Sequence, residues 1–162
     1  MTPVIMKTVL VAFHSRTGHT AEVAQNIAAG LNADVEQLRE AEERAYFRAG
    51  LDALLGRTCD LAGSITSPGN YDLVVLGTPV WAMNLPPPMR SYIVEHAGEL
   101  PKVAFFCTEG GGGGNRVFGQ MARLCGKSPL ATLEVTEPEM KSGTSESKIK
   151  GFIDALSQKL AD

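Results

Sequence analysis

Three short apolar runs, each followed by a loop and a helix-like stretch, constrain this chain more than any other feature of its sequence. The runs are KTVLVAF (7–13), YDLVVLGT (71–78) and KVAFFCT (102–108). Continuous apolar runs of this length are typical of strands that are buried on both faces of a parallel sheet. Weaker candidates for strands are DVEQL (34–38) and LATLEV (130–135).

Helix-like stretches alternate with these runs and cover residues 20–31, 87–96, 116–125 and 145–160. Alternating strands and helices form right-handed βαβ units, in which helices cover both faces of a parallel sheet. A chain of 162 residues is most simply one domain. We therefore predict a single-domain α/β fold over residues 1–162, built on a doubly wound, five-stranded parallel sheet.

The segment 41–70 is long for a connection and contains AYFRAGLDALLG, whose apolar residues suggest a helical insertion. Its apolar residues include Tyr46, Phe47, Leu51 and Leu55. Three roles stay open for the insertion: covering a ligand, joining two copies of the chain in a homodimer, or packing on the edge of its own sheet.

The composition of the chain argues against several kinds of binding partner. The net charge of −3 is mild, and nucleic-acid recognition usually leaves a basic footprint, so we expect no nucleic-acid partner. The cysteines Cys59, Cys107 and Cys125 have no CxxC spacing, which favours neither a disulfide framework nor a metal site. No apolar run approaches the roughly 18 residues that span a bilayer, and the N-terminus resembles a strand rather than a signal peptide. We expect a cytoplasmic protein with no membrane partner.

The first of the loops, SRTGHT (15–20), lies between a buried strand and a helix. Hydroxyl groups, a glycine and the N–H groups of a helix N-terminus suit a phosphate. The lysine of the nucleotide-hydrolase P-loop and the glycines of the dinucleotide fingerprint are both missing from this stretch. One alternative stays open, in which Ser15 or Thr17 only caps the helix.

The other two loops suit a flat ring. In TPVWAMNLPPPMRSYI (78–93), the lone Trp81 either stacks on a planar group or fills the core under the loop. In CTEGGGGGNRVF (107–118), the five glycines 110–114 indicate close approach of the backbone to a ligand, with a flexible linker as the alternative. Together the three loops predict one elongated ligand with an anionic tail and a polar-edged ring, and FMN fits this description.

These motifs resemble those of the flavodoxin-like family, and the resemblance covers nearly the whole chain. SRTGHT resembles the family's (S/T)xTGxT phosphate loop, TPVWAMNLPPPMRSYI its first ring loop, and CTEGGGG its second ring loop. The resemblance implies strand order 2-1-3-4-5 and bound FMN. It assigns the phosphate to Ser15, Arg16, Thr17, Gly18, His19 and Thr20. It assigns the flavin ring to Pro79, Val80, Trp81, Ala82, Met83 and Asn84 and to Thr108, Glu109, Gly110, Gly111 and Gly112.

The chain also departs from flavodoxins that carry single electrons. Those proteins commonly keep a glycine in the first ring loop, where this chain has Ala82, Met83 and Asn84, and a positive φ is less accessible to residues other than glycine. They often cover the ring with an aromatic from the second ring loop, where this chain has glycines and Glu109, and they are usually strongly acidic. The departures favour two-electron hydride chemistry at a ring with one open face.

Two functions follow from this reasoning. The first is an FMN-dependent oxidoreductase that passes electrons from NAD(P)H to a quinone-like or other small acceptor. The alternative is a flavodoxin-type electron carrier that docks on redox partner proteins; a regulatory module without flavin is disfavoured by the three intact loops. We assign no catalytic residue, because the cofactor carries the chemistry. Glu109 is interpreted chiefly as a solvated loop carboxylate, and His14 equally as a packed or capping residue.

Overall fold

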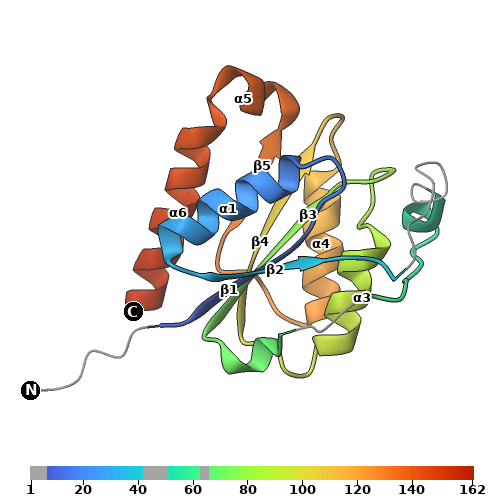
Figure 1. Cartoon of the computed structure of the whole chain (residues 1–162), viewed down its shortest axis with the longest axis horizontal. Coiled ribbons are helices and arrows are strands. Elements are labelled where there is room, and N and C mark those ends of the chain that lie inside the picture. Colours follow the sequence, from blue (N-terminus) through green and yellow to red (C-terminus); the bar gives the residue numbers. More distant parts are fainter. Residues whose placement is uncertain (1–6, 42–50, 63–65) are drawn as a thin grey trace, which may run out of the picture.

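The structure, a computed structural model, describes residues 7–41, 51–62 and 66–162. Its centre is a sheet of five parallel strands in the order β2-β1-β3-β4-β5 (Figure 1). The strands are β1 (Val9–His14), β2 (Asp34–Leu38), β3 (Leu73–Pro79), β4 (Lys102–Glu109) and β5 (Thr132–Thr136). The predicted five-stranded α/β sheet and its strand order are confirmed.

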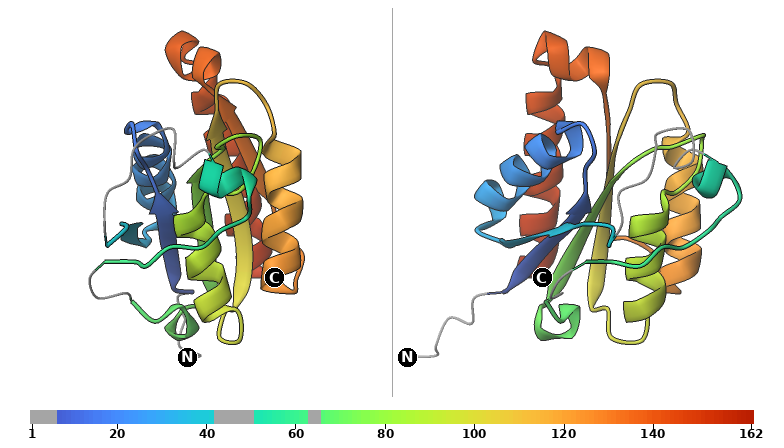
Figure 2. Two further views of the ribbon diagram at one scale, coloured as in Figure 1. Left: turned by 90° about the vertical axis from the view of Figure 1, so that its right-hand side faces the viewer. Right: turned by 45° about the vertical axis from the view of Figure 1, so that its right-hand side comes forward.

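Helices cover both faces of the sheet, as Figure 2 shows. They are α1 (His19–Leu31), α3 (Pro87–His96), α4 (Gly114–Cys125), α5 (Glu137–Ser142) and α6 (Ser145–Ala161), with a short 3-10 helix, η1 (Pro68–Asn70). Helices α1 and α6 share one apolar core with the sheet, and α3 and α4 share the other. The sequence analysis missed α5, which begins at a capping box formed by Thr136 and Glu139.

The position of each strand explains the strength of its apolar pattern. Every residue of β1 is buried, and β3 and β4 are buried except at one end each. The edge strand β2 is mostly exposed, and β5, at the other edge, is buried at alternate positions only. Strands with helices on both faces need apolar residues at consecutive positions, whereas an edge strand does not.

Successive residues of the central strands point to opposite faces and so divide between the two cores. Val11 and Phe13 pack toward α1 and α6, and Leu10 and Ala12 pack toward α3. Gly77 of β3 admits the ring of Phe106 on β4, because a Cβ atom at this position would lie 1.9 Å from Cζ of that ring. The close packing of β3 on β4 therefore depends on a glycine.

Part of the predicted insertion is described. Residues 51–54 are helical, with Asp52 and Ala53 buried and Leu54 and Leu55 exposed. Tyr46 and Phe47 lie outside the described residues, so the three roles considered for the insertion stay predictions. None of the helices within the described ranges is long and apolar enough to cross a membrane.

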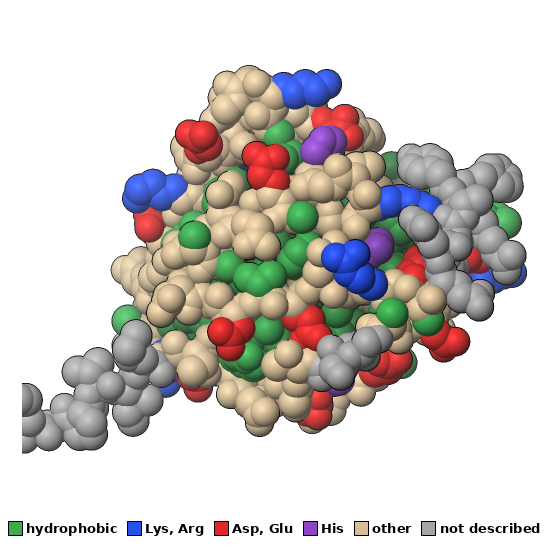
Figure 3. Space-filling model, in the orientation of Figure 1, with side chains coloured by type: hydrophobic (Ala, Val, Ile, Leu, Met, Phe, Trp, Pro, Cys, Tyr) green, Lys and Arg blue, Asp and Glu red, His purple; other side chains and the backbone are tan. Residues whose placement is uncertain are grey.

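Charges of both signs occur on the molecular surface. On the face drawn in Figure 3, acidic and basic side chains are interspersed over the described residues. This distribution agrees with the mild net charge of −3.

Candidate functional site

The three loops singled out in the sequence leave the carboxyl ends of the adjacent strands β1, β3 and β4. They are the phosphate loop (15–20), the first ring loop (79–84) and the second ring loop (108–112). The two ring loops are joined by a hydrogen bond from the Val80 N–H to the Thr108 carbonyl, 3.2 Å. Strand β1 is flanked by β2 on one side and β3 on the other, so the direction of winding reverses here. Ligands of open α/β sheets bind at such a reversal.

The phosphate loop is held in shape by Ser15 and by Gly18. The Ser15 hydroxyl accepts hydrogen bonds from the N–H groups of Gly18 and Ala21, both 3.2 Å. Gly18 precedes α1 with a φ of 98°, and no atom lies within 4 Å of the position that its Cβ would take. Thr17 is exposed. The space beside Gly18 is therefore open. Ser15 satisfies the Ala21 N–H in the first turn of α1, but the residue at the N-cap is Gly18.

The remaining predicted phosphate residues make contacts of their own. Thr20 is buried, and its hydroxyl lies 2.7 Å from that of Thr108, which links the phosphate loop to the second ring loop. His19 is half-exposed, with Nδ1 3.7 Å from Oε1 of Glu137 on α5. The guanidinium carbon of Arg16 lies 5.3 Å from the ring centroid of Trp81. Contacts from β4, from α5 and from the first ring loop thus meet at the phosphate loop.

The first ring loop is a tight turn, and its backbone corrects one expectation. Trp81 and Asn84 exchange two backbone hydrogen bonds of 3.1 and 2.9 Å, and the residues between them, Ala82 and Met83, have φ values of 49° and 63°. The expectation that residues without glycine's freedom would avoid positive φ here is wrong. The left-handed conformation costs about 1–2 kcal/mol per residue, and the hydrogen bonds across the turn offset part of that cost.

Asn84 fastens this turn to α4. Its buried side-chain oxygen accepts hydrogen bonds from Nε of Arg116, 2.9 Å, and from Nε2 of Gln120, 2.8 Å. Its amide nitrogen donates to the Ala82 carbonyl, 3.2 Å, and Oε1 of Gln120 accepts from the Leu85 N–H, 2.9 Å. The sequence analysis missed Arg116 and Gln120, whose spacing of four residues on a helix was the only signal. The Asn84 side chain therefore positions the loop.

The glycine run divides into two parts with different roles. Gly111 and Gly112 have no atom within 4 Å of the positions of their absent Cβ atoms, which suits close approach of a ligand. A Cβ at Gly110 would touch the Glu137 carboxylate at 3.4 Å, and one at Gly113 would lie 3.0 Å from Cγ1 of Val80. A Cβ at Gly114 would lie 2.5 Å from Oε2 of Glu134. The last two glycines of the run thus serve packing within the protein.

Glu109 is buried at the end of β4 and is not the solvated loop carboxylate that the sequence suggested. Its carboxyl faces Glu134 of β5, close to the N-terminus of α4. Burial first, and then the nearby Glu134, raise the pKa of Glu109 to about 7, against the opposing effects of the Gly114 N–H and Lys148. Glu109 therefore keeps its proton up to near neutral pH.

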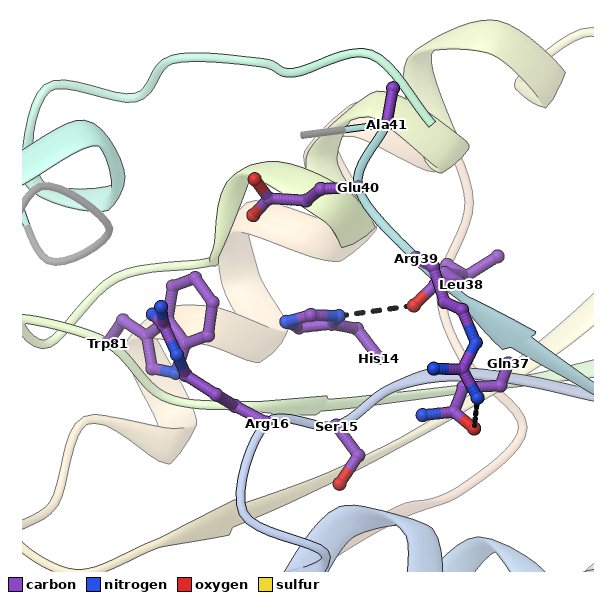
Figure 4. A pocket seen from close by; sticks show the side chains of 9 residues that line it. All are labelled: His14, Ser15, Arg16, Gln37, Leu38, Arg39, Glu40, Ala41 and Trp81. Atoms are coloured by element: carbon purple, nitrogen blue, oxygen red, sulfur yellow. Dashed lines mark hydrogen bonds between the residues drawn. The ribbon is translucent and has the colours of Figure 1, made fainter. Parts of the chain in front are cut away.

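A pocket of about 510 Å³ opens between the carboxyl ends of β1 and β2 (Figure 4). Of the predicted residues it includes Ser15, Arg16 and Trp81. The sequence analysis did not predict the rest of the lining, which consists of His14, Gln37, Leu38, Arg39, Glu40 and Ala41. The residues from β2 carried no motif, because their proximity to the phosphate loop results from strand pairing.

His14 lies at the centre of this pocket. Its Nδ1 is 3.3 Å from the Leu38 carbonyl oxygen, and its ring meets Trp81 edge-on with centroids 5.1 Å apart. Burial lowers the pKa of His14 to about 4, with a smaller contribution in the same direction from Arg16. Its Nε2 is buried and has no hydrogen-bond partner among the described residues. His14 is thus a packed residue, as one of the two interpretations had it, with one polar atom left over.

Comparison with known proteins supports the fold and goes no further. No family model matches the sequence, and no curated protein does. A flavoprotein from Lactobacillus acidophilus, solved in complex with FMN, is 18% identical with a TM-score of 0.70, and the match covers 84% of this chain and 97% of that one. The apo-form of the flavoprotein from the same organism is 19% identical with a TM-score of 0.60, covering 85% and 97%.

Oxidised flavodoxin 2 from Bacillus cereus is 16% identical with a TM-score of 0.56, and the match covers 94% of this chain and 99% of that one. At sequence identities this low, a structural match establishes the fold of the chain but not its ligands. The strand order, the helices on both faces and these likenesses together show that the chain has the flavodoxin-like fold.

Proposed function

We propose that this protein binds FMN at the carboxyl ends of β1, β3 and β4. The observation that carries the proposal is the open space at Gly18, Gly111 and Gly112, where a ligand can approach the backbone without interference from side chains. The complex of the Lactobacillus acidophilus flavoprotein with FMN supports the same cofactor for this fold.

Different parts of the chain would bind different parts of the cofactor. The N–H groups at the start of α1, with the hydroxyl of Thr17, would hold the phosphate, and the positive end of the helix dipole would favour its charge. The backbones of the two ring loops would meet the edges of the ring, and Trp81 would pack against it. When bound, FMN supplies the electron chemistry.

We further propose that the protein is an oxidoreductase that passes electrons from NAD(P)H to a quinone-like or other small acceptor. The pocket beside Trp81, about 510 Å³, lies within the range of small-molecule sites and adjoins the phosphate loop. An electron carrier that docks on partner proteins is the second candidate. The positive φ values of Ala82 and Met83 favour this candidate. Flavodoxins that carry single electrons commonly keep a glycine in this loop, and the two residues here adopt the positive φ that is most accessible to glycine.

The first test is binding of FMN to the apoprotein, followed by quenching of flavin fluorescence. Thr17→Ala is expected to weaken binding five- to tenfold, since one hydrogen bond to a charged group is lost. Thr132→Ala is the matched control, because Thr132 is exposed at the start of β5, the end of the strand remote from the loops. Absence of FMN binding by the unaltered protein would refute the proposal.

The second test separates the two candidate functions. The FMN-loaded protein is titrated anaerobically with NADH or NADPH while its visible spectrum is recorded. Bleaching of the oxidised band by either nicotinamide supports the oxidoreductase. Reduction by dithionite but by neither nicotinamide supports the electron carrier.

A further inference from the structure

The pocket between β1 and β2 extends away from the three predicted loops and has a donor set of its own. His14 ends β1, and Gln37, Arg39 and Glu40 come from the end of β2 and the residues after it. None of these four belongs to the phosphate loop or the ring loops. The residues that reach in from those loops are Ser15, Arg16 and Trp81.

His14 defines what a ligand of this pocket must offer. A carbonyl oxygen only accepts hydrogen bonds, so the contact with Leu38 requires the proton of the ring to be on Nδ1. With a pKa of about 4, the ring is neutral at pH 7, and Nε2 is then a hydrogen-bond acceptor. This nitrogen is buried without a partner, and Figure 4 shows it directed toward the space between Trp81 and Glu40. A ligand with an O–H or N–H group at this point would remove the cost of the unpaired acceptor.

The charged side chains define a second requirement. Among the described residues that line the pocket, Arg16 and Arg39 are the two positively charged side chains, and Glu40 is the one carboxylate. One nitrogen of Arg39 donates to Oε1 of Gln37, 3.0 Å, which orients the guanidinium group. An oriented guanidinium presents its remaining N–H groups to a carboxylate or a phosphate.

Trp81 defines the third requirement, because its ring forms one wall of the pocket. An aromatic wall favours a flat ligand that stacks or meets it edge-on. A pocket of about 510 Å³ has room for a molecule of one or two rings.

We propose that this pocket binds a small planar molecule that donates an O–H or N–H group to Nε2 of His14 and directs a carboxylate or phosphate to Arg39. The proposal rests on the proposed function in one respect: Ser15, Arg16 and Trp81 belong to the loops that would hold FMN, so a ligand here would lie beside the cofactor. Two sources share this chemistry, a hydroxylated aromatic acid and a nicotinamide nucleotide, whose carboxamide supplies the N–H group.

The test is calorimetric titration of the FMN-loaded protein at pH 7 with 4-hydroxybenzoate, 4-methoxybenzoate, 4-hydroxybenzamide and nicotinamide mononucleotide. We expect 4-hydroxybenzoate or the nucleotide to bind one to one, and the tighter of the two identifies the source. The methoxy compound, which lacks the donor, and the benzamide, which lacks the charge, are each expected to bind about tenfold more weakly than 4-hydroxybenzoate.

Variants place the ligand in the pocket. Arg39→Gln is expected to weaken binding of the anionic probe about tenfold and to leave binding of 4-hydroxybenzamide unchanged. Arg123→Gln is the matched control, because Arg123 is an exposed arginine on α4 that does not line the pocket.

Three results would overturn the proposal: no binding of either 4-hydroxybenzoate or the nucleotide, equal binding of the hydroxy and methoxy compounds, or displacement of the probe by FMN added to the apoprotein. The last result would mean that the pocket is part of the cofactor site itself. The same titration of the apoprotein separates this proposal from the previous one. Binding of the probe without binding of FMN would refute FMN as the cofactor and support the pocket as a binding site. Binding of FMN without binding of the probe would support the cofactor and refute the pocket as a binding site.

Discussion

Replacement of Glu109 by glutamine is expected to stabilise the folded protein above pH 7 and to leave it nearly unchanged at pH 4. In the folded state, burial and Glu134 raise the pKa of Glu109 from 4.5 to about 7. Each pH unit between the folded and unfolded pKa corresponds to about 1.4 kcal/mol, so ionised Glu109 costs at most about 3.5 kcal/mol. Glutamine does not ionise, and its amide N–H can donate to Glu134 in place of the proton of Glu109.

The direction of the pH dependence follows from proton binding. Below pH 4.5, Glu109 is protonated in the folded and the unfolded state, and it contributes nothing. Between pH 4.5 and 7, the unfolded chain has released the proton while the folded protein keeps it, so the free energy of unfolding falls as the pH rises. Above the folded pKa of about 7 the loss is complete. The variant lacks this loss, and its advantage should grow from near zero to about 2–3 kcal/mol.

The assay is urea unfolding of both proteins at pH 4, 5.5, 7 and 8.5, with the FMN content of the samples matched. The difference in unfolding free energy between the variant and the unaltered protein is the quantity to compare, because other titrating groups cancel in it. Glu95→Gln is the control, since Glu95 is exposed on α3. A difference that does not change with pH, or a variant that is less stable at pH 8.5, would refute the assignment of a buried proton to Glu109.

Other substitutions test the contacts between the loops and the helix caps. Thr20→Val should cost about 1–2 kcal/mol of unfolding free energy, because the buried Thr108 hydroxyl loses its partner at 2.7 Å, and the double variant with Thr108→Val should cost less than the sum of the single ones. Gly113→Ala should cost about 1–3 kcal/mol, because Gly113 has a φ of 101°, whereas Gly151→Ala, in the open interior of α6, should stabilise by about 0.5–1 kcal/mol. Thr136→Ala removes the capping box of α5 and should cost about 1 kcal/mol. Urea unfolding measures all of these, and equal stability of the Gly113 and Gly151 variants would contradict the packing described for the glycine run.

The sequence predicted the central part of the fold because burial on two faces leaves a pattern within a single segment. The runs 7–13, 71–78 and 102–108 became β1, β3 and β4, which are the three middle strands of the sheet. Since βα connections bring the carboxyl ends of parallel strands to one edge, the order of elements also placed the three loops together. The short helix α5 was missed because its six residues, EPEMKS, have no apolar face; the capping residues Thr136 and Glu139 were its only signal.

The conformation of the first ring loop shows where local preferences fail. Alanine and methionine disfavour positive φ, and no sequence feature indicated it at Ala82 and Met83. The turn takes that conformation because backbone hydrogen bonds close it and Asn84 ties it to Gln120 on α4. Hydrogen bonds within the turn and a partner 36 positions away in the sequence thus hold the backbone of this loop together.

The sequence by itself therefore determined the strands and the edge of the sheet at which a ligand would bind, whereas the order of the strands came from the resemblance to the flavodoxin-like family. Only the tertiary structure decided which polar groups at that edge are satisfied and which are not. It placed Glu109 beside Glu134, directed Nε2 of His14 toward a pocket, and brought Arg39, which follows the neighbouring strand β2, into the lining of that pocket. Apolar periodicity reports whether a residue is buried, but a pKa or a hydrogen bond depends on the distance to groups that strand pairing brings close. That distance has no counterpart in the local sequence.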